Sequence, residues 1–220
     1  MRDIHVIYTD FTHLGQGWDL SCPQIPTLVG GDMSLRRLLD ETPNILEFAG
    51  VEGPYNLIQH EQKYAETPDG LGFYLRFLGL DDPHEDDRVA VIGRQLHAVC
   101  SGEIIDELDR IPPLPSGERL IIAVHKSDRL GWVLDQMGDG EGCIACSYEG
   151  DDAIYSLPVA HDDCDYGRGR TLDELGLTRD SSIGDAFDTV LASEVADLVK
   201  VLDRSDLPAT ADVHGLLHYR

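Results

Sequence analysis

The stretch that decides the fold prediction runs from Gly17 to Leu39. It reads GWDLSCPQIPTLVGGD over residues 17–32 and MSLRRLL over residues 33–39. It predicts a strand, a second strand punctuated by prolines, a glycine turn and then a helix with a polar residue at its start. No other segment combines turn, cap and apolar spacing as clearly, so the rest of the chain is interpreted around it.

Two strands are predicted at the start of the chain. Residues 3–11 alternate side chains in the pattern of a strand, with Ile4, Val6 and Tyr8 on one side. Residues 12–17 contain two glycines and no apolar pattern, which indicates a hairpin loop. Residues 18–22 are the returning strand.

The segment after this second strand is predicted to lie at a sheet edge or a bend. Pro23 and Pro26 have no backbone N–H, so neither can donate to an inner ladder of the sheet. Residues 27–29 then form a short third strand, which Gly30 and Gly31 close.

A helix follows the glycines. Asp32 or Ser34 can accept a hydrogen bond from the first turn and cap it. Pro43 removes one hydrogen bond and is expected to kink or divide the helix near Thr42. Its apolar stripe consists of Leu35, Leu38, Leu39, Ile45, Leu46 and Phe48.

The motifs of this region, in chain order, are HVIY at residues 5–8, Gly-Trp at 17–18, SCPQIP at 21–26, LVGGD at 28–32 and SLR at 34–36. With these motifs, residues 4–48 resemble the N-terminal domain of HicB-like antitoxins. The resemblance implies a β-β-β-α-β core of truncated ribonuclease-H-like arrangement, which in that family sits over a small ribonuclease toxin. We predict a docking face between residues 18 and 29 that includes Trp18, Pro23, Gln24, Ile25 and Pro26.

The balance of charge is strongly acidic. The chain has 41 aspartates and glutamates and 17 lysines and arginines, which gives a formal net charge of −24. Direct binding to a nucleic-acid backbone is disfavoured, because the chain has no run of basic residues longer than Arg36-Arg37 or Arg168-Gly169-Arg170. Two explanations stay open: solubility, including a high-salt proteome, and an acidic face for a basic partner.

Composition also bears on location. Residues 1–5 lack the apolar core of a signal peptide, so a cytoplasmic location is expected, and no apolar run approaches the length of a membrane span. The five cysteines are an odd number and do not suggest a disulfide framework.

The fold prediction is α+β. Residues 1–80 form the HicB-like β-β-β-α domain, residues 88–204 a second α/β domain, and residues 205–220 a tail. The acidic residues 81–87 form the linker between them. Residues 55–65 are predicted as a helix, and residues 71–78 as a strand or a buried helical turn.

The second half is predicted as alternating elements. The strands are residues 88–93, 119–125, 143–148 and 153–159, and the last two form a hairpin. The helices are residues 96–111, 130–137, 171–177 and 182–203, with Ser182 and Asp185 as a capping pair at the start of the last one.

The strongest metal-like pattern is Cys143, Cys146, His161 and Cys164, two ligand pairs of the kind that hold tetrahedral zinc. Two features argue against it: Ile144-Ala145 lacks the glycine or proline of a knuckle, and residues three apart in a strand face opposite sides. A zinc ion here would be structural, since all four ligands come from protein.

Other chemistry-bearing residues are weaker candidates. His97 with Cys100 and His125 with Ser127 could serve a hydrolase, but Cys100 fits an apolar helix face and Ser127 fits a helix cap. No phosphate-binding glycine loop is present.

The leading functional prediction is a non-enzymatic, acidic partner-binding protein of antitoxin or inhibitor type that sequesters a basic protein, such as a small ribonuclease toxin. No cofactor is expected beyond a structural zinc. The alternatives are a zinc-stabilised interaction domain, a nucleic-acid-mimicking inhibitor, and the hydrolase. A homo-oligomer is also left open.

Overall fold

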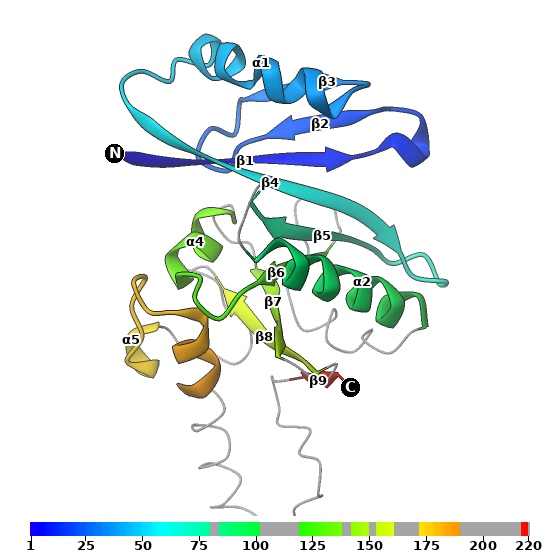
Figure 1. Ribbon diagram of the computed structural model, residues 1–220, viewed down its shortest axis with the longest axis vertical. Coiled ribbons are helices and arrows are strands. Elements are labelled where there is room, and N and C mark those ends of the chain that lie inside the picture. Colours follow the sequence, from blue (N-terminus) through cyan, green and yellow to red (C-terminus); the bar gives the residue numbers. More distant parts are fainter. Residues whose placement is uncertain are drawn as a thin grey trace, which may run out of the picture.

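The structure is a computed structural model, and it describes residues 1–79, 84–101, 119–137, 142–149, 153–160, 172–189 and 217–219. These residues form a mixed α/β fold around one sheet with both parallel and antiparallel strands (Figure 1). The prediction that helices and strands share the fold is confirmed at this level. Within the described part of the chain the strand order is β3-β2-β1-β4-β5-β6-β7-β8-β9.

The elements are bounded as follows. The strands are β1 (Arg2–Asp10), β2 (Trp18–Ser21), β3 (Val29–Asp32), β4 (Tyr55–Glu66), β5 (Gly72–Leu78), β6 (Arg119–Val124), β7 (Gly142–Glu149), β8 (Ala153–Ala160) and β9 (Leu217–Tyr219). The helices are α1 (Leu35–Phe48), α2 (Glu85–Ser101), α4 (Leu130–Asp135) and α5 (Leu172–Leu175), with a 3-10 turn, η1 (Thr12–Leu14), and a helical segment over residues 183–189.

The N-terminal strands pair in the order of a meander that a helix then closes. β1 is antiparallel to β2, β2 is antiparallel to β3, and β4 returns parallel to β1 after α1. The face under α1 carries Ile4, Val6 and Tyr8 of β1 and Leu20 of β2, all buried. Ile4, Val6 and Tyr8 therefore share one face of β1, as predicted, and this face is the one that α1 covers. The likeness to HicB-like antitoxins stays a prediction.

The third strand lies later than predicted. β3 begins at Val29, and residues 22–28 form turns instead, in which the N–H of Leu28 donates to the carbonyl of Ile25 at 2.8 Å. Gly30 and Gly31 lie inside the strand rather than closing it. A Cβ on Gly30 would lie 3.1 Å from Cδ1 of Ile45, so a glycine lets α1 pack close to the strand.

The predicted division of the helix at Pro43 is wrong, because α1 is continuous through it, and the predicted kink stays a prediction. Pro43 is exposed and leaves only the carbonyl of Leu39 without its helical donor. One residue earlier, the Thr42 hydroxyl donates to the carbonyl of Leu38 at 2.7 Å and also contacts the Tyr8 hydroxyl at 2.7 Å. The buried side chains of α1 therefore hold the helix on the sheet across the proline.

Residues 55–65 form strand β4 and not the predicted helix. β4 pairs with β1 on one side and with β5 on the other, so it lies inside the sheet. Two of its buried positions hold polar residues, His60 and Gln62. These polar residues hide the apolar alternation by which a strand is normally found.

The predicted strand over residues 88–93 is also wrong, because these residues belong to α2. Val91 and Ile92 are buried against the sheet in the company of Leu75 and Ile121. The part of the proposed linker from Glu85 onward is the first turn of the same helix. The predicted helix over residues 96–111 begins inside α2, and its residues after Ser101 lie outside the described part.

Several other predictions are confirmed. β6 matches the strand expected over residues 119–125, and α4 matches the helix expected over residues 130–137. β7 and β8 form the expected antiparallel pair. Ser182 and Asp185 cap each other's backbone N–H groups at 3.2 and 3.0 Å. The described part of the last helix is residues 183–189.

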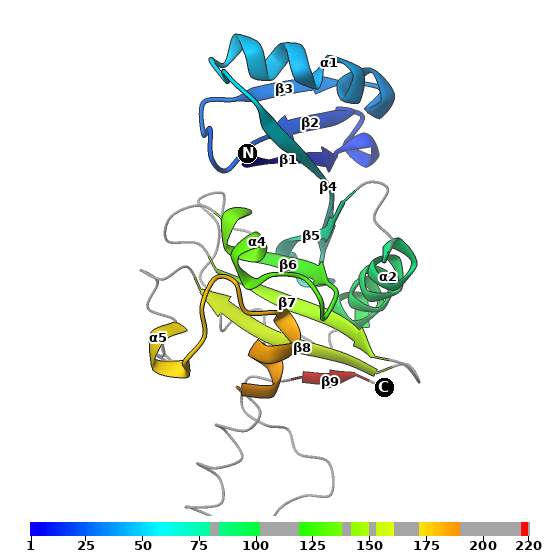
Figure 2. The ribbon, with the colours of Figure 1, turned by 60° about the vertical axis from the view of Figure 1, so that its left-hand side comes forward.

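Different helices pack on the two faces of the central strands β5, β6 and β7. α2 covers the face of β5, β6 and β7 that bears Ile121 and Cys146, whereas α4 and residues 183–189 cover the face that bears Ile122 and Cys143. Figure 2 shows α2 and α4 on the two sides of β6. The sheet continues across the predicted domain boundary through the parallel pair β5–β6, and the division into two domains stays a prediction.

Among the described residues, no helix combines the length and the apolarity needed to cross a membrane.

Replacing Gly17 by alanine is expected to destabilise the fold more than the same change at Gly15. Both glycines have positive φ, which costs an alanine about 1–2 kcal/mol. A Cβ at Gly17 would lie 2.7 Å from the carbonyl oxygen of Asp32, whereas none of the described atoms lies within 4 Å at Gly15. Gly17→Ala should therefore lose about a further 1–3 kcal/mol of unfolding free energy in urea titrations. Equal losses would contradict this packing.

Candidate functional site

The predicted docking residues lie in β2 and in the turns between β2 and β3, at one end of the sheet. Trp18 and Ile25 are half-buried and pack against the core beneath α1. Pro23 is half-buried, and Gln24 and Pro26 are exposed. Trp18 thus lies inside the sheet, since β2 pairs with both β1 and β3, while the other four residues lie in the turns that follow β2. The two large apolar side chains, Trp18 and Ile25, are partly used within the fold.

Gln24 is committed to contacts inside the chain. Its Oε1 accepts from the backbone N–H of His5 at 3.2 Å and from the Cys22 thiol at 3.4 Å. Its Nε2 donates to the carbonyl of Asp135 at the end of α4, at 3.2 Å. Gln24 therefore ties the turn to β1 and to α4, which is a structural role that the docking prediction did not include.

Strand β3 is an open edge of the sheet in the described part of the chain. It is the first strand in the order and pairs only with β2 there. Val29 is 79% exposed, and Met33 just after the strand is 69% exposed. An edge strand presents unpaired N–H and carbonyl groups that another chain can extend. This edge begins at Val29, the last residue of the predicted docking region, and in the described part of the chain it is available to a partner.

A cluster of buried polar side chains lies under α4, on the face of the sheet opposite α1. His5 of β1 and His60 of β4 are both fully buried, and their rings stack within 2° of parallel. Nδ1 of His5 lies 2.9 Å from Nε2 of His60. Trp132 of α4 meets the His5 ring edge-on. The other ring nitrogens, Nε2 of His5 and Nδ1 of His60, have no hydrogen-bond partner among the described residues.

The pair is held in its uncharged form. Burial lowers the pKa of His5, and the Asp135 and Asp3 carboxylates oppose this shift only in part. Burial lowers the pKa of His60 well below its ordinary value, and repulsion from Arg76 and from His5, when His5 is protonated, lowers it further. Both shifts favour the uncharged rings, in which one imidazole donates to the other.

A buried arginine borders the histidine pair. Nε of Arg76, on β5, donates to Oε1 of Gln62 at 2.8 Å, and its Nη1 donates to the carbonyl of Gln136 at 2.7 Å. Gln62 in turn donates to the Thr9 hydroxyl at 3.1 Å. These bonds join β1, β4 and β5 to the end of α4 through polar side chains, where most folds place apolar ones.

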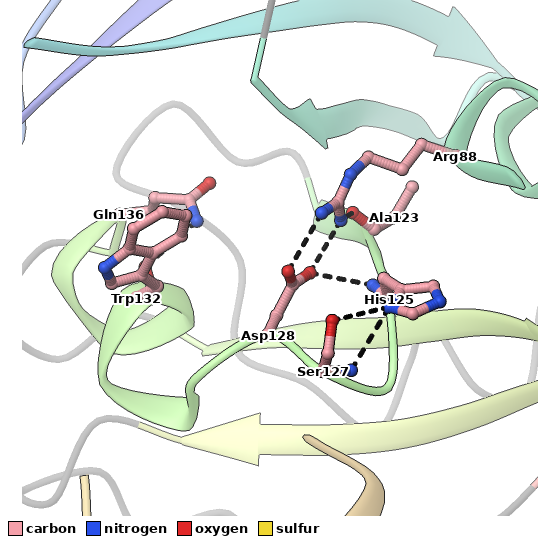
Figure 3. Close-up of polar contacts among 7 residues, drawn as sticks. All are labelled: Arg88, Ala123, His125, Ser127, Asp128, Trp132 and Gln136. Carbon is pink, nitrogen blue, oxygen red and sulfur yellow. Dashed lines mark hydrogen bonds and ion pairs between the residues drawn. The ribbon is translucent and has the colours of Figure 1, made fainter. Parts of the chain in front are cut away.

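The loop between β6 and α4 is organised by a buried ion pair (Figure 3). Arg88 of α2 makes two bonds to the Asp128 carboxylate, at 2.6 and 2.9 Å, and both side chains are over 90% buried. The same carboxylate accepts from the backbone N–H of His125 at 2.7 Å. The ion pair therefore fastens this loop to a helix on the other face of the sheet.

Ser127 does not cap α4 as predicted. Arg129 is the residue before the helix, and it makes no side-chain cap. Instead the Ser127 hydroxyl lies 2.7 Å from Nδ1 of His125, and the Ser127 N–H donates to the same nitrogen at 3.2 Å. The His84 ring stacks on the His125 ring, with 3.5 Å between the two ring centroids. The bonds from Ser127 to His125 are local to the loop, and they order it.

The other catalytic and metal candidates are not brought together in the described residues. His97 is exposed on α2, and the Cys100 side chain lies outside what the structure describes. Cys143 and Cys146 are buried on opposite faces of β7, so one ion cannot meet both thiols while β7 stays in the sheet. His161 and Cys164 lie outside the described residues, and the described part holds no group of three metal-binding side chains. The zinc site stays a prediction.

Sequence reasoning missed the histidine pair and the ion pair. Both depend on residues far apart in the chain: 55 residues separate His5 from His60, and 40 separate Arg88 from Asp128. The one local signal was the placement of His60 and Gln62 two residues apart, which puts both on one face if the segment is a strand.

Comparison with known proteins gives one distant likeness. No protein-family model matches the chain, and no solved structure matches it. The chain is 31% identical over 168 residues to the phenylalanine–tRNA ligase beta subunit of Natronomonas pharaonis, a match that covers 66% of this chain. The chain spans only 28% of the length of that relative.

Proposed function

We propose that this chain is a non-enzymatic, acidic protein that binds and sequesters a basic protein partner, as an antitoxin or an inhibitor does. The observation that carries the proposal is the open edge at β3, where Val29 and Met33 are exposed beside the predicted docking turns. The net charge of −24 supports it, because a strongly acidic surface attracts and orients a basic partner.

The arrangement of polar groups also supports a binding role. His5, His60, Arg76, Arg88 and Asp128 are all buried and bonded to one another or to the backbone. Groups in this state order the protein interior, whereas a catalytic base must reach a substrate. The element order β-β-β-α-β at the N-terminus agrees with the HicB-like arrangement that the motifs suggest.

The test is capture of small, positively charged ribonuclease toxins by the immobilised full chain. We expect binding at about 0.1 M salt that is largely lost near 1 M, where charges are screened within about 3 Å. Polyglutamate on the same support is the control for simple ion exchange. Absence of binding at low salt, or equal capture by polyglutamate, would overturn the proposal. Metal analysis of chain purified without chelator tests the zinc-stabilised alternative in the same preparation.

The likeness to a tRNA ligase subunit supports a second candidate, a protein that associates with phenylalanine–tRNA ligase. Such a chain would bind the ligase rather than the tRNA, since its charge disfavours nucleic acid. The expected result is co-elution of the full chain with purified ligase. If the chain elutes apart from the ligase and leaves the aminoacylation rate unchanged, this candidate is removed.

A further inference from the structure

The two faces of β3 differ in a way that specifies what can pair with it. Val29 and Gly31 point to one face, opposite Ser21 and Asp19 of β2, whereas Gly30 lies opposite the buried Leu20 on the α1 face. The strand is four residues long, contains no proline or lysine, and carries one charged residue, Asp32, at its end. In the described part of the chain only β2 pairs with it, so its other side can receive an added strand there.

The glycine at position 31 leaves a carboxylate next to this edge. Asp19 is exposed, and a Cβ on Gly31 would lie 3.1 Å from its Oδ1. A side chain larger than hydrogen at position 31 would lie between this carboxylate and the edge. Without one, the Asp19 carboxylate lies beside the β3 backbone, within reach of a side chain on a strand added at the edge.

The opposite face of β3 is apolar. Gly30 lies against Ile45 of α1, which is itself only half-buried. An apolar side chain on an added strand, placed opposite Gly30, would extend the core beneath α1. Val29 on the outer face is 79% exposed and can be covered by the methylene stem of a long basic side chain.

We propose that β3 receives an extended segment of a basic partner as an additional strand of the sheet. In this complex a lysine or arginine opposite Gly31 pairs with Asp19, and an apolar residue opposite Gly30 packs on α1. The proposal rests on the proposed function and adds the surface and the chemistry of the partner. A second copy of this chain is the wrong occupant, because two chains of net charge −24 repel and neither β3 carries a basic residue.

The test uses a short blocked peptide in which lysine alternates with valine, titrated into the full chain by calorimetry. Methylation of alternate backbone nitrogens on one edge of the peptide removes its strand-pairing donors without changing its charge. We expect this methylation to weaken binding about tenfold, the loss of one to two hydrogen bonds. Equal binding of the two peptides would overturn strand addition.

A matched pair of variants tests the role of Asp19. Asp19→Asn and Asp40→Asn remove the same charge from exposed sites, the first beside the open edge and the second on α1. Only Asp19→Asn should weaken binding of the peptide, by about threefold to fivefold, as expected for the loss of one exposed ion pair. Equal effects would overturn the assignment of Asp19. If basic toxins bind in a salt-sensitive way but the peptide does not compete with them, this inference fails and the proposed function stands.

Discussion

Replacing Asp128 by asparagine is expected to reduce the free energy of unfolding by about 3–5 kcal/mol. The change leaves the Arg88 guanidinium, which is 1% exposed, without its carboxylate in the protein interior. Removing the carboxylate from a buried guanidinium costs more than removing an ordinary hydrogen bond, because the buried charge loses its negative partner. Urea titration followed by circular dichroism at constant pH measures the difference.

Two further variants separate this effect from a general sensitivity of the loop. Asp180→Asn removes an exposed carboxylate 4.0 Å from Arg129 and should change stability by less than about 1 kcal/mol. Arg88→Met combined with Asp128→Asn removes both charges and keeps an oxygen that can accept from the N–H of His125. This double variant should be more stable than Asp128→Asn alone. A less stable double variant would show that Arg88 stabilises the fold through contacts other than its ion pair with Asp128.

Acidification is expected to weaken the fold through the His5–His60 pair. The pKa of both histidines is lowered in the folded chain, so below their ordinary value of 6.5 the unfolded chain binds protons that the folded chain does not. The contribution of the pair is therefore complete above pH 6.5 and is lost as the pH falls from there toward the lowered pKa values. Each histidine contributes a slope of up to about 1.4 kcal/mol per pH unit.

The groups that face the pair make its response specific. Asp3 of β1 and Asp135 of α4 favour protonation of His5, while Arg76 of β5 and Arg88 of α2 disfavour protonation of His60. His60→Gln should reduce the pH dependence of the unfolding free energy between about pH 5 and pH 6.5. In this range most aspartates and glutamates remain ionised and contribute little to the slope. His97→Gln makes the same substitution at an exposed site on α2 and serves as the matched control. The same slope in wild type and His60→Gln would refute the assignment.

The accuracy of the sequence predictions followed how local their signals are. β6, α4 and the β7–β8 pair were found because apolar runs and turn residues within each segment suffice to define them. The capping pair of Ser182 and Asp185 was found for the same reason, since its partners lie three residues apart. β4 was missed because its strand pattern is carried by buried His60 and Gln62, which look like surface residues in the sequence.

The first part of α2, residues 85–93, has the sequence pattern of a linker and a strand for a related reason. The acidic start of the segment, Glu85-Asp86-Asp87, is typical of a solvated connector, and Val89-Ala90-Val91-Ile92 is typical of a strand. In the fold, packing of Val91 and Ile92 on the sheet and the bond from Arg88 to Asp128 favour the helix. Tertiary contacts outweigh local propensity when the difference in propensity is about 1 kcal/mol.

The sequence by itself determined the acidic character of the chain, the order of its first strands and helix, and the two glycines among the four residues of β3. These properties depend on composition or on neighbours a few residues apart. Only the tertiary structure decided that β3 is the end strand of the sheet among the described residues, that Asp19 lies beside it, and that His5 meets His60 in the interior. The physical reason is that strand order and burial are set by which distant segments pair, and the pairing partner of a strand is not written in the strand itself.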